Sequence, residues 1–513
     1  ISRTFSKTFG QRILGDGLSK EALDIGKITY VLFADKGDGY TVSLKDENGK
    51  PEMDLVDPFR RQGADDGAGE SAEPSEDGLL RTSLGEISSE FRILAITVPA
   101  DTNATRLLAF AADLEKEVRG KNLFFTTDIK SAVKKCDIIF VGVNTPTKMF
   151  GRGAGRASDL QFWEATAREI KGYAEGDKIV VEKSTLPVRT SAAMEAILNG
   201  GTGNGERGIR FTVLSNPEFL AEGTAIKDLL SPDRVLIGGP ETLEGRSAVR
   251  EICEIYAGKD GKWVERYKIL TTNVWSAELT KLAANAMLAQ RVSSVNALAG
   301  LCEATGADID EVARVMGADR RIGSKFLKAG PGFGGSCFKK DVLNLVYLCE
   351  TFGLHTAAEY WSGVIKMNDH QQERIVSRLF KAMFNTLANK KIAMFGFAFK
   401  ADTGDTRETP AGYVARLLNE EHVRLAITDP KAIENGKRDL AGLDGITWEK
   451  DPYKAAKDAD AVLLMTDWKE YPALDWEKIF KSMRKPALVF DTRNCLDAGA
   501  LKKIGFRVLN VGK

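Results

Sequence analysis

Short β-branched runs alternate with helical periods from about Arg92 onward, and this alternation constrains the fold more than any other feature of the sequence. The predicted strands are residues 92–98, 137–143, 178–183, 211–215 and 234–237, and residues 159–173 form a predicted helix between two of them. Strands that alternate with helices in this way are typical of βαβ units, whose strands pair in parallel under covering helices. The pattern therefore predicts a doubly wound α/β domain.

The strand signals fade between about Thr272 and Met383, where long helical periods rich in Ala, Leu, Glu, Lys and Arg take over. A second βα series follows at residues 391–395, 423–428, 461–465, 487–490 and 507–511. We therefore predict an α/β fold with two Rossmann-like doubly wound domains, at residues 91–273 and 385–513. An all-helical middle domain at residues 274–384 joins them and is the expected dimerisation platform.

The first 90 residues follow a different pattern. Two β-rich runs, at residues 28–33 and 40–44, flank the turn-forming segment 35–39 and suggest a hairpin. Residues 60–78 form a tract of Gly, Asp, Glu and Ser with few apolar side chains, which is typical of disorder. We expect residues 1–90 to be an atypical, partly disordered N-terminal extension.

The composition excludes several classes of partner. Lys plus Arg and Asp plus Glu number 72 each, so no overall field favours nucleic acid or an anionic membrane, and we expect neither. The six cysteines are too sparse for a disulfide scaffold and form no Cys-x-x-Cys pair, which favours a cytoplasmic location. Three histidines and the lack of metal-ligand spacing predict no metal site. No apolar run approaches the roughly 18 residues that span a bilayer.

Cys337 ends a glycine-rich run, with glycines at 332, 334 and 335, so that a ligand can approach the backbone closely. Two interpretations stay open at this point. An isolated free cysteine is usually a small buried hydrophobe. The neighbouring Lys339 and Lys340, however, would lower the pKa of the thiol and favour a reactive thiolate.

Two further pairs have helical spacing. Lys281 and Asn285 are four residues apart, so both could face one oxygen atom and stabilise negative charge on it, although such a pair taken alone is more often a surface feature. Glu218 and Glu222 have the same spacing just after a predicted strand. They could bind hydroxyl groups or activate water, or could simply be acids at a helix N-terminus.

Polar runs also follow the predicted strands, at residues 144–147, 184–185 and 216–218, where parallel sheets bind ligands. A dinucleotide-binding domain should open with Gly-x-Gly-x-x-Gly and carry an acid about 20 residues on. Asp101 is a fair candidate for that acid, yet residues 75–99 contain no such glycine cluster.

Four longer runs are the most specific, at residues 216–228, 321–328, 332–341 and 396–408. Together they closely resemble the UDP-glucose 6-dehydrogenases of the UDP-glucose/GDP-mannose dehydrogenase family, and the likeness extends from about Gly120 to Lys513. The resemblance implies an NAD-dependent, four-electron oxidation of UDP-glucose to UDP-glucuronate by a homo-oligomer, either a dimer or an assembly of dimers.

The resemblance also implies roles for individual residues. Cys337 would form a thiohemiacetal and then a thioester. Lys281, Asn285 and a water held by Thr185 would stabilise charge on oxygen and relay protons. Glu218 and Asp341 would assist proton transfer and thioester hydrolysis.

The expected UDP-glucose site consists of Glu218, Phe219, Leu220, Ala221, Glu222, Lys281, Asn285, Arg321, Lys328, Phe333, Gly334, Phe399, Lys400 and Arg493. The last of these matches a family arginine that reaches the substrate from a neighbouring subunit or domain. The expected NAD site consists of Asp101, Arg106, Val143, Asn144, Thr145, Pro146, Thr147, Ser184, Thr185, Glu222 and Arg407.

The departure from the family lies upstream, where its opening strand and glycine-rich turn are absent. Without that turn, NAD lacks a cradle of backbone amides for its pyrophosphate. A truncated or faulty N-terminal coding region, which the start at Ile1 rather than Met favours, is one explanation, and a variant with weak or no oxidase activity is the other. The alternative function is then a catalytically impaired nucleotide-sugar-binding homologue. A dehydrogenase acting on GDP-mannose or UDP-N-acetylmannosamine is a third hypothesis, which fits the long runs less well.

Overall fold

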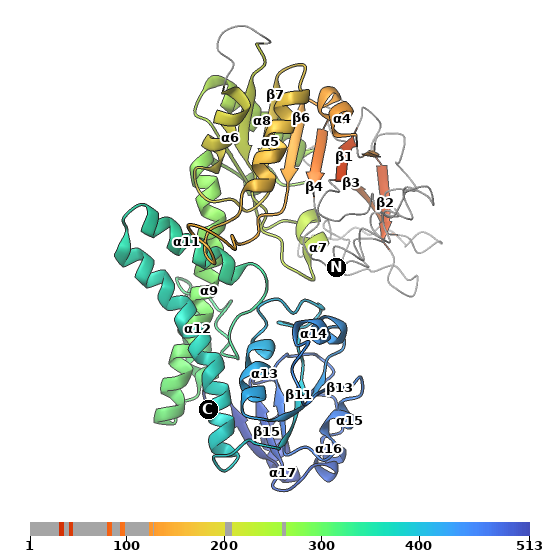
Figure 1. Ribbon diagram of the computed structural model, residues 1–513, viewed down its shortest axis with the longest axis vertical. Helices are drawn as coiled ribbons and strands as arrows, with labels where there is room; N and C mark the ends of the chain where they lie inside the picture. The colour runs from red at the N-terminus through yellow and green to blue at the C-terminus, as the bar shows by residue number, and fades with distance from the viewer. Residues whose placement is uncertain are drawn as a thin grey trace, which may run out of the picture. The chain divides into compact units, whose positions relative to one another are not determined.

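The computed structural model describes residues 128–200, 208–258 and 263–513, together with five strands further upstream (Figure 1). The chain divides into two compact units. Unit 1 consists of residues 1–148 and 158–281, and unit 2 of residues 149–157 and 282–513. Asp101, Arg106 and most of the N-terminal extension, with its predicted disorder, lie outside the described residues.

Unit 1 contains an eight-stranded sheet in the order β10-β9-β8-β7-β6-β4-β1-β5. Strands β4, β6, β7 and β8 pair in parallel, as do β9 and β10, which agrees with the predicted βαβ pattern. The strands are β1 (Tyr30–Ala34), β4 (Ile93–Thr97), β5 (Leu123–Thr126), β6 (Ile138–Gly142), β7 (Lys178–Glu182), β8 (Phe211–Ser215), β9 (Val235–Gly239) and β10 (Ile269–Asn273).

The suggested N-terminal hairpin is wrong, although both of its strands exist. β1 runs antiparallel between β4 and β5, whereas β2 (Tyr40–Leu44) pairs with β3 (Leu80–Leu84). A turn-forming segment limits which strands can follow one another, but hydrogen-bond partners from distant parts of the chain decide which strands pair.

The helices of unit 1 cover both faces of its sheet. They are α4 (Ile129–Lys135), α5 (Gln161–Tyr173), α6 (Thr190–Asn199), α7 (Ala225–Leu230) and α8 (Leu243–Ala257). Ile139 and Val180 belong to one apolar cluster and their neighbours Ile138 and Val181 to another, because successive strand residues face opposite sides. The two clusters confirm the doubly wound prediction.

Long helices dominate residues 274–384, as predicted. They are α9 (Val274–Thr305), whose first two turns belong to unit 1, α10 (Ile309–Ala318), α11 (Phe338–Thr351) and α12 (His355–Ala382). Helices α9 and α12 pack along each other in unit 2, where Ser293 Oγ donates to the carbonyl of Val364 and Glu303 pairs with Arg374 (Figure 1). No described helix is long and apolar enough to cross a membrane.

The second sheet has six parallel strands in the order β13-β12-β11-β14-β15-β16, which is the 3-2-1-4-5-6 order of a doubly wound fold. The strands are β11 (Lys391–Phe395), β12 (Arg424–Thr428), β13 (Ile446–Trp448), β14 (Ala461–Leu464), β15 (Leu488–Asp491) and β16 (Arg507–Asn510). The accompanying helices are α13 (Pro410–Glu420), α14 (Ile433–Asp439), α15 (Pro452–Ala456), α16 (Trp476–Ser482) and α17 (Ala498–Ile504). Of these strands, only the short β13 was not predicted.

Asp429 directly follows the last residue of β12, at the carboxyl end of that strand in the second sheet. Its Oδ2 accepts hydrogen bonds from the backbone N–H groups of Phe397 and Ala398 at 2.7 and 3.0 Å, and from the indole of Trp468 at 3.1 Å. Its Oδ1 accepts from the N–H groups of Lys431 and Ala432. The carboxylate therefore fixes the loop after β11, which carries Phe399 and Lys400, to the loop after β12.

Candidate active site

Cys337 lies directly before the first residue of α11 and is exposed. The interpretation of this residue as a buried hydrophobe is therefore wrong. Its Sγ is 3.4 Å from the hydroxyl oxygen of Ser336. The thiol therefore lies at the N-terminal end of a 14-residue helix, where a substrate can reach it. Lys339, which the sequence offered as an activating cation, instead pairs with Glu408 at 2.9 Å.

The glycine loop before Cys337 is held by buried side-chain amides from two helices. Asn368 of α12 accepts from the N–H of Phe333 at 2.8 Å and donates to the carbonyl of the same residue. Gln371 donates to the carbonyl of Gly330, and Asn296 of α9 accepts from its N–H. Sequence analysis missed these amides, whose only signal is a polar residue at a buried helical position.

Gly334 and Gly335 pack against the segment that follows β11. A Cβ at Gly334 would lie 2.5 Å from the carbonyl oxygen of Glu408. Gly335 has a φ of +86° and donates its N–H to the carbonyl of Arg407 at 2.9 Å. Only glycine allows so close an approach, so the run fixes Cys337 to the residues around Arg407.

Asn285 and Asp341 form a buried pair inside unit 2. The Nδ2 of Asn285 donates to Asp341 Oδ2 at 2.6 Å, and both residues are buried. Asp341 lies one helical turn after Cys337 on α11, so it belongs to the same face of that helix. For Asn285, the interpretation as a surface feature is wrong.

Lys281 lies on α9 one turn before Asn285, as its spacing predicted, and is buried in unit 1. Its Nζ is 5.3 Å from the centre of the Phe219 ring. The guanidinium of Arg234 lies 3.8 Å from the centre of the same ring. Phe219 therefore contacts two cations, and sequence analysis gave no role to Arg234.

The segment from Asn216 to Thr224 is not helical, so the helical spacing assumed for Glu218 and Glu222 is wrong. The N-terminal end of this segment is anchored by Asn216, whose side chain donates to the carbonyl of Leu236 and accepts from the hydroxyl of Tyr256. Its last residue, Thr224, donates to Asp228, which also accepts the N–H of Ala221. Glu218 is exposed in the middle of this segment, and the helix begins only at α7.

The expected NAD residues of unit 1 gather at the carboxyl ends of β6 and β7. Ser184 Oγ donates to the carbonyl of Val143 at 2.6 Å, and Thr145 Oγ1 donates to the carbonyl of Thr185 at 3.2 Å. Asn144, between these bonded residues, is exposed. Two joined loops at this edge of a parallel sheet fit the binding of a dinucleotide. These residues could contribute to holding NAD.

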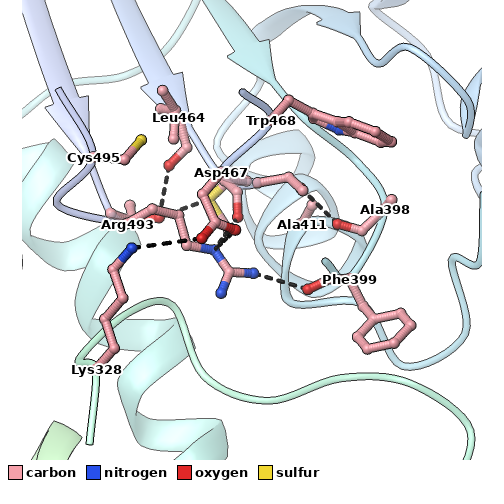
Figure 2. Close-up of polar contacts among 12 residues, drawn as sticks. Lys328, Ala398, Phe399, Ala411, Leu464, Asp467, Trp468, Arg493 and Cys495 are labelled. Atoms are coloured by element: carbon pink, nitrogen blue, oxygen red, sulfur yellow. Dashed lines mark hydrogen bonds and ion pairs between the residues drawn. The ribbon is translucent and has the colours of Figure 1, made fainter. Parts of the chain in front are cut away.

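The expected substrate residues Lys328 and Arg493 meet at Asp467 in unit 2 (Figure 2). Lys328 Nζ is 3.5 Å and Arg493 Nε 3.9 Å from that carboxylate. Arg493 also donates to the carbonyls of Met465 and Phe399, each at 2.8 Å, so its guanidinium is fixed in orientation. Although burial acts to raise the pKa of Asp467, Arg493 and Lys328 hold it below its ordinary value.

Other predicted residues have partners elsewhere. Arg321 is highly exposed and pairs with Asp319 at 2.6 Å. Arg407 pairs with Asp405 at 2.8 Å. Lys400 Nζ lies 5.6 Å from the centre of the Phe399 ring. Arg321 therefore makes no described contact with the cluster at Asp467.

A pocket of about 460 Å³ opens in unit 2 next to Arg407. Its lining contains both acidic and basic side chains, and burial is the main reason why the pKa of Asp369 in its wall is raised. Its lining consists of Phe333, Lys339, Asn368, Asp369, Gln372, Phe397, Thr406, Arg407, Glu408, Thr409, Gly412, Tyr413, Arg416 and Asp439.

An exposed thiol at a helix N-terminus, a buried amide–carboxylate pair one turn away and two doubly wound sheets together fit a dinucleotide-dependent oxidoreductase. Models of one family match the chain in three consecutive parts. The NAD-binding domain of the UDP-glucose/GDP-mannose dehydrogenase family matches residues 109–258, its central domain residues 275–370 and its UDP-binding domain residues 393–498. The chain belongs to this family.

Individual relatives agree with the family models. The chain is 52% identical over 451 residues to UDP-glucose 6-dehydrogenase 3 of Arabidopsis thaliana, covering 83% of this chain and 92% of the relative. It is 54% identical over 418 residues to UDP-glucose 6-dehydrogenase 1 of Glycine max, covering 78% and 85%. A solved structure of a UDP-glucose dehydrogenase from the archaeon Pyrobaculum islandicum matches at 30% identity with a TM-score of 0.63, covering 74% of this chain and 83% of that one. These matches do not favour the alternative of a catalytically impaired homologue.

Proposed function

We propose that the protein oxidises the C6 alcohol of UDP-glucose twice, to UDP-glucuronate, with NAD as hydride acceptor. The observation that carries the proposal is the exposed Cys337 thiol at the start of α11, one turn from the buried Asn285–Asp341 pair. The names of the relatives from Arabidopsis thaliana and Glycine max support UDP-glucose as the substrate.

In the proposed scheme, the C6 alcohol first loses a proton and a hydride and becomes the aldehyde. The Cys337 thiolate adds to the carbonyl carbon, a C–S bond forms, and the oxygen takes up a proton to give the thiohemiacetal. Loss of a second hydride and of the hydroxyl proton leaves a thioester, which water cleaves to the carboxylate and the free thiol. NAD, when bound, takes up one hydride at each of the two oxidations, so two NAD are reduced per UDP-glucose.

Several side chains stabilise the developing negative charge and transfer the protons. Lys281 and Asn285 stabilise the negative oxygen of the tetrahedral adducts, and loss of one such donor costs about 10²–10³ in kcat. Asp341 orients the Asn285 amide through the 2.6 Å hydrogen bond and assists proton transfer. Glu218, exposed in its non-helical segment, acts with a water held by Thr185 in proton relay and thioester hydrolysis.

The remaining residues bind the sugar nucleotide and the cofactor. Lys328 and Arg493, which both lie beside Asp467, provide cationic hydrogen-bond donors for an anionic diphosphate. Arg407, joined through its backbone to the cysteine loop, contributes to NAD binding together with the loops after β6 and β7. The UDP-glucose contacts further include Phe219 to Glu222, Arg321, Phe333, Gly334, Phe399 and Lys400.

We propose that the protein works in the cytoplasm as a homo-oligomer, a dimer or an assembly of dimers. Large apolar side chains exposed along α9, among them Trp275, Leu279, Met287 and Leu301, support association through the helical segment. Sedimentation of the purified protein measures the oligomeric state.

The direct test measures NADH formed per UDP-glucose at saturating NAD. We expect two NADH per sugar nucleotide, and no NADH from Cys337→Ser. Cys253→Ser, which removes a half-buried cysteine of α8, is the matched control and should leave the rate unchanged. Binding of UDP-glucose without NADH formation would contradict the proposal. Initial rates with GDP-mannose and UDP-N-acetylmannosamine should be far lower.

A further inference from the structure

Two buried carboxyl groups in unit 1 have no role in the scheme above. Glu182 ends β7 and Glu278 lies in the second turn of α9, and their exposed fractions are 0% and 2%. Neither forms an ion pair within the part of the chain that the structure describes. Buried carboxylates are normally paired with a cation, because an isolated buried charge is strongly unfavourable. This pair therefore needs another explanation.

Glu278 caps the N-terminus of α6 from a different helix. Its Oε2 accepts from the N–H of Arg189 at 2.7 Å and its Oε1 from the N–H of Ser191 at 2.7 Å. The ten-residue helix α6 begins after Arg189, which has a φ of +75° and provides no side-chain cap of its own. The guanidinium of Arg189 also lies 4.7 Å from the centre of the Trp275 ring on α9. Three contacts thus join the start of α6 to the start of α9.

The two carboxyl groups are close enough to influence each other's protonation, and they differ in their other partners. Both oxygens of Glu278 accept backbone hydrogen bonds, which makes a protonated Glu182 the better donor between the two. No N–H or hydroxyl group donates to either Glu182 oxygen among the residues that the structure describes. Burial, and then the neighbouring Glu278, raise the pKa of Glu182 well above its ordinary value, which agrees with a neutral Glu182.

The loop between β7 and α6 carries Thr185, and it is held from both sides. On one side, Ser184 and Thr145 bond it to the loop after β6. On the other, Glu278 binds its last residue, Arg189. Lys281 follows Glu278 by three residues on the same rigid helix, so the two side chains share a face of α9.

We propose that Glu182 and Glu278 form a carboxyl latch that fixes the Lys281 turn of α9 relative to the Thr185 loop, which makes Glu278 a positioning residue for the oxidation. The kinetic consequence rests on the proposed function. The structural consequence, a fixed N-terminus of α6, does not depend on it.

The test compares neutral variants at the two positions, with kcat and the KM for UDP-glucose measured separately. In Glu278→Gln, the single amide oxygen accepts only one of the two N–H groups, so we expect kcat to fall about ten- to hundredfold while KM stays within about twofold. In Glu182→Gln, the amide N–H donates to Glu278 as the protonated carboxyl does, so kcat should stay within about twofold. Glu164→Gln, on the exposed face of α5, is the matched control.

Hydrogen exchange at the amides of Arg189 and Ser191 is the second readout, and it requires no activity. It should accelerate at least about tenfold in Glu278→Gln and stay unchanged in Glu182→Gln and Glu164→Gln. Should Glu278→Gln fail to fold, Glu278→Asp, which keeps the charge but cannot reach both N–H groups, takes its place. Equal losses of kcat in the Gln variants at 182 and 278, or unchanged exchange in Glu278→Gln, would overturn the latch. Absence of NADH formation by the unmutated chain would instead count against the proposed function.

Discussion

The side-chain amide of Asn285 donates to Asp341 over 2.6 Å, and each of these two residues lies one helical turn after a predicted catalytic residue. Asn285 follows Lys281 on α9, and Asp341 follows Cys337 on α11. One hydrogen bond thus joins the two helices one turn after the residues to which we assign the chemistry.

Replacing Asn285 with alanine should damage both stability and turnover. The variant removes a buried donor from the Asp341 carboxylate, which costs about 1–3 kcal/mol of unfolding free energy, and it removes an oxyanion donor, which costs about 10²–10³ in kcat. Urea unfolding and steady-state NADH formation measure the two effects. A variant with normal kcat would contradict the role assigned to Asn285.

Gly334→Ala tests how closely the cysteine loop is packed. The new methyl group would lie 2.5 Å from the carbonyl oxygen of Glu408, so the loop must move, at a cost of about 1–3 kcal/mol. We expect slower alkylation of Cys337 by iodoacetamide and a lower kcat. Gly363→Ala, inside α12 with no atom within 4 Å of the added methyl, is the control and should be neutral or slightly stabilising.

Asp467 should make stability depend on acidity. Because Arg493 and Lys328 depress its pKa in the folded protein, its contribution to stability is present above the ordinary aspartate range and is lost as pH falls through the depressed value. Asp467→Asn removes that contribution. The melting temperatures of variant and parent should differ at neutral pH and converge in acid, as calorimetry across this range would measure. A constant difference would show that the ion pairs do not contribute.

Glu182 should make stability depend on pH in the opposite direction to Asp467. Its pKa is raised in the folded protein, so the folded state binds a proton that the unfolded state releases above the ordinary glutamate range, and stability falls as pH rises. Glu182→Gln abolishes this loss. The melting temperature of the variant relative to the parent should therefore increase from acid to alkaline pH. The opposite trend would mean that Glu182 is ionised in the folded protein.

Local patterns predicted much of this fold because they depend on few residues. Runs of β-branched residues predicted the strands β6, β7, β8 and β11. A long, unbroken helical periodicity predicted α9. The spacing of Glu218 and Glu222 misled because that segment is not helical and distant partners of Asn216 anchor its start. The spacing of residues along the sequence cannot reveal such tertiary hydrogen bonds.

The supporting polar groups of the site were harder to predict. Asn296, Asn368 and Gln371 hold the cysteine loop, but each is an ordinary helical residue until the loop packs against it. The same applies to Glu278, whose partners lie 87 and 89 residues away along the chain. Their roles depend on tertiary contacts rather than on sequence spacing.

Asp429 has a consequence for how the two doubly wound domains differ. In a dinucleotide-binding domain, the acid at the end of the second strand binds a ribose hydroxyl. Here the carboxylate that ends β12 binds four backbone N–H groups and an indole of its own chain, and it is 2% exposed. The second sheet has the strand order of a cofactor domain, but its strand-end carboxylate is already occupied by the protein's own backbone and cannot also bind a ribose. This agrees with the separate family models that match the two domains, one for NAD binding and one for UDP binding.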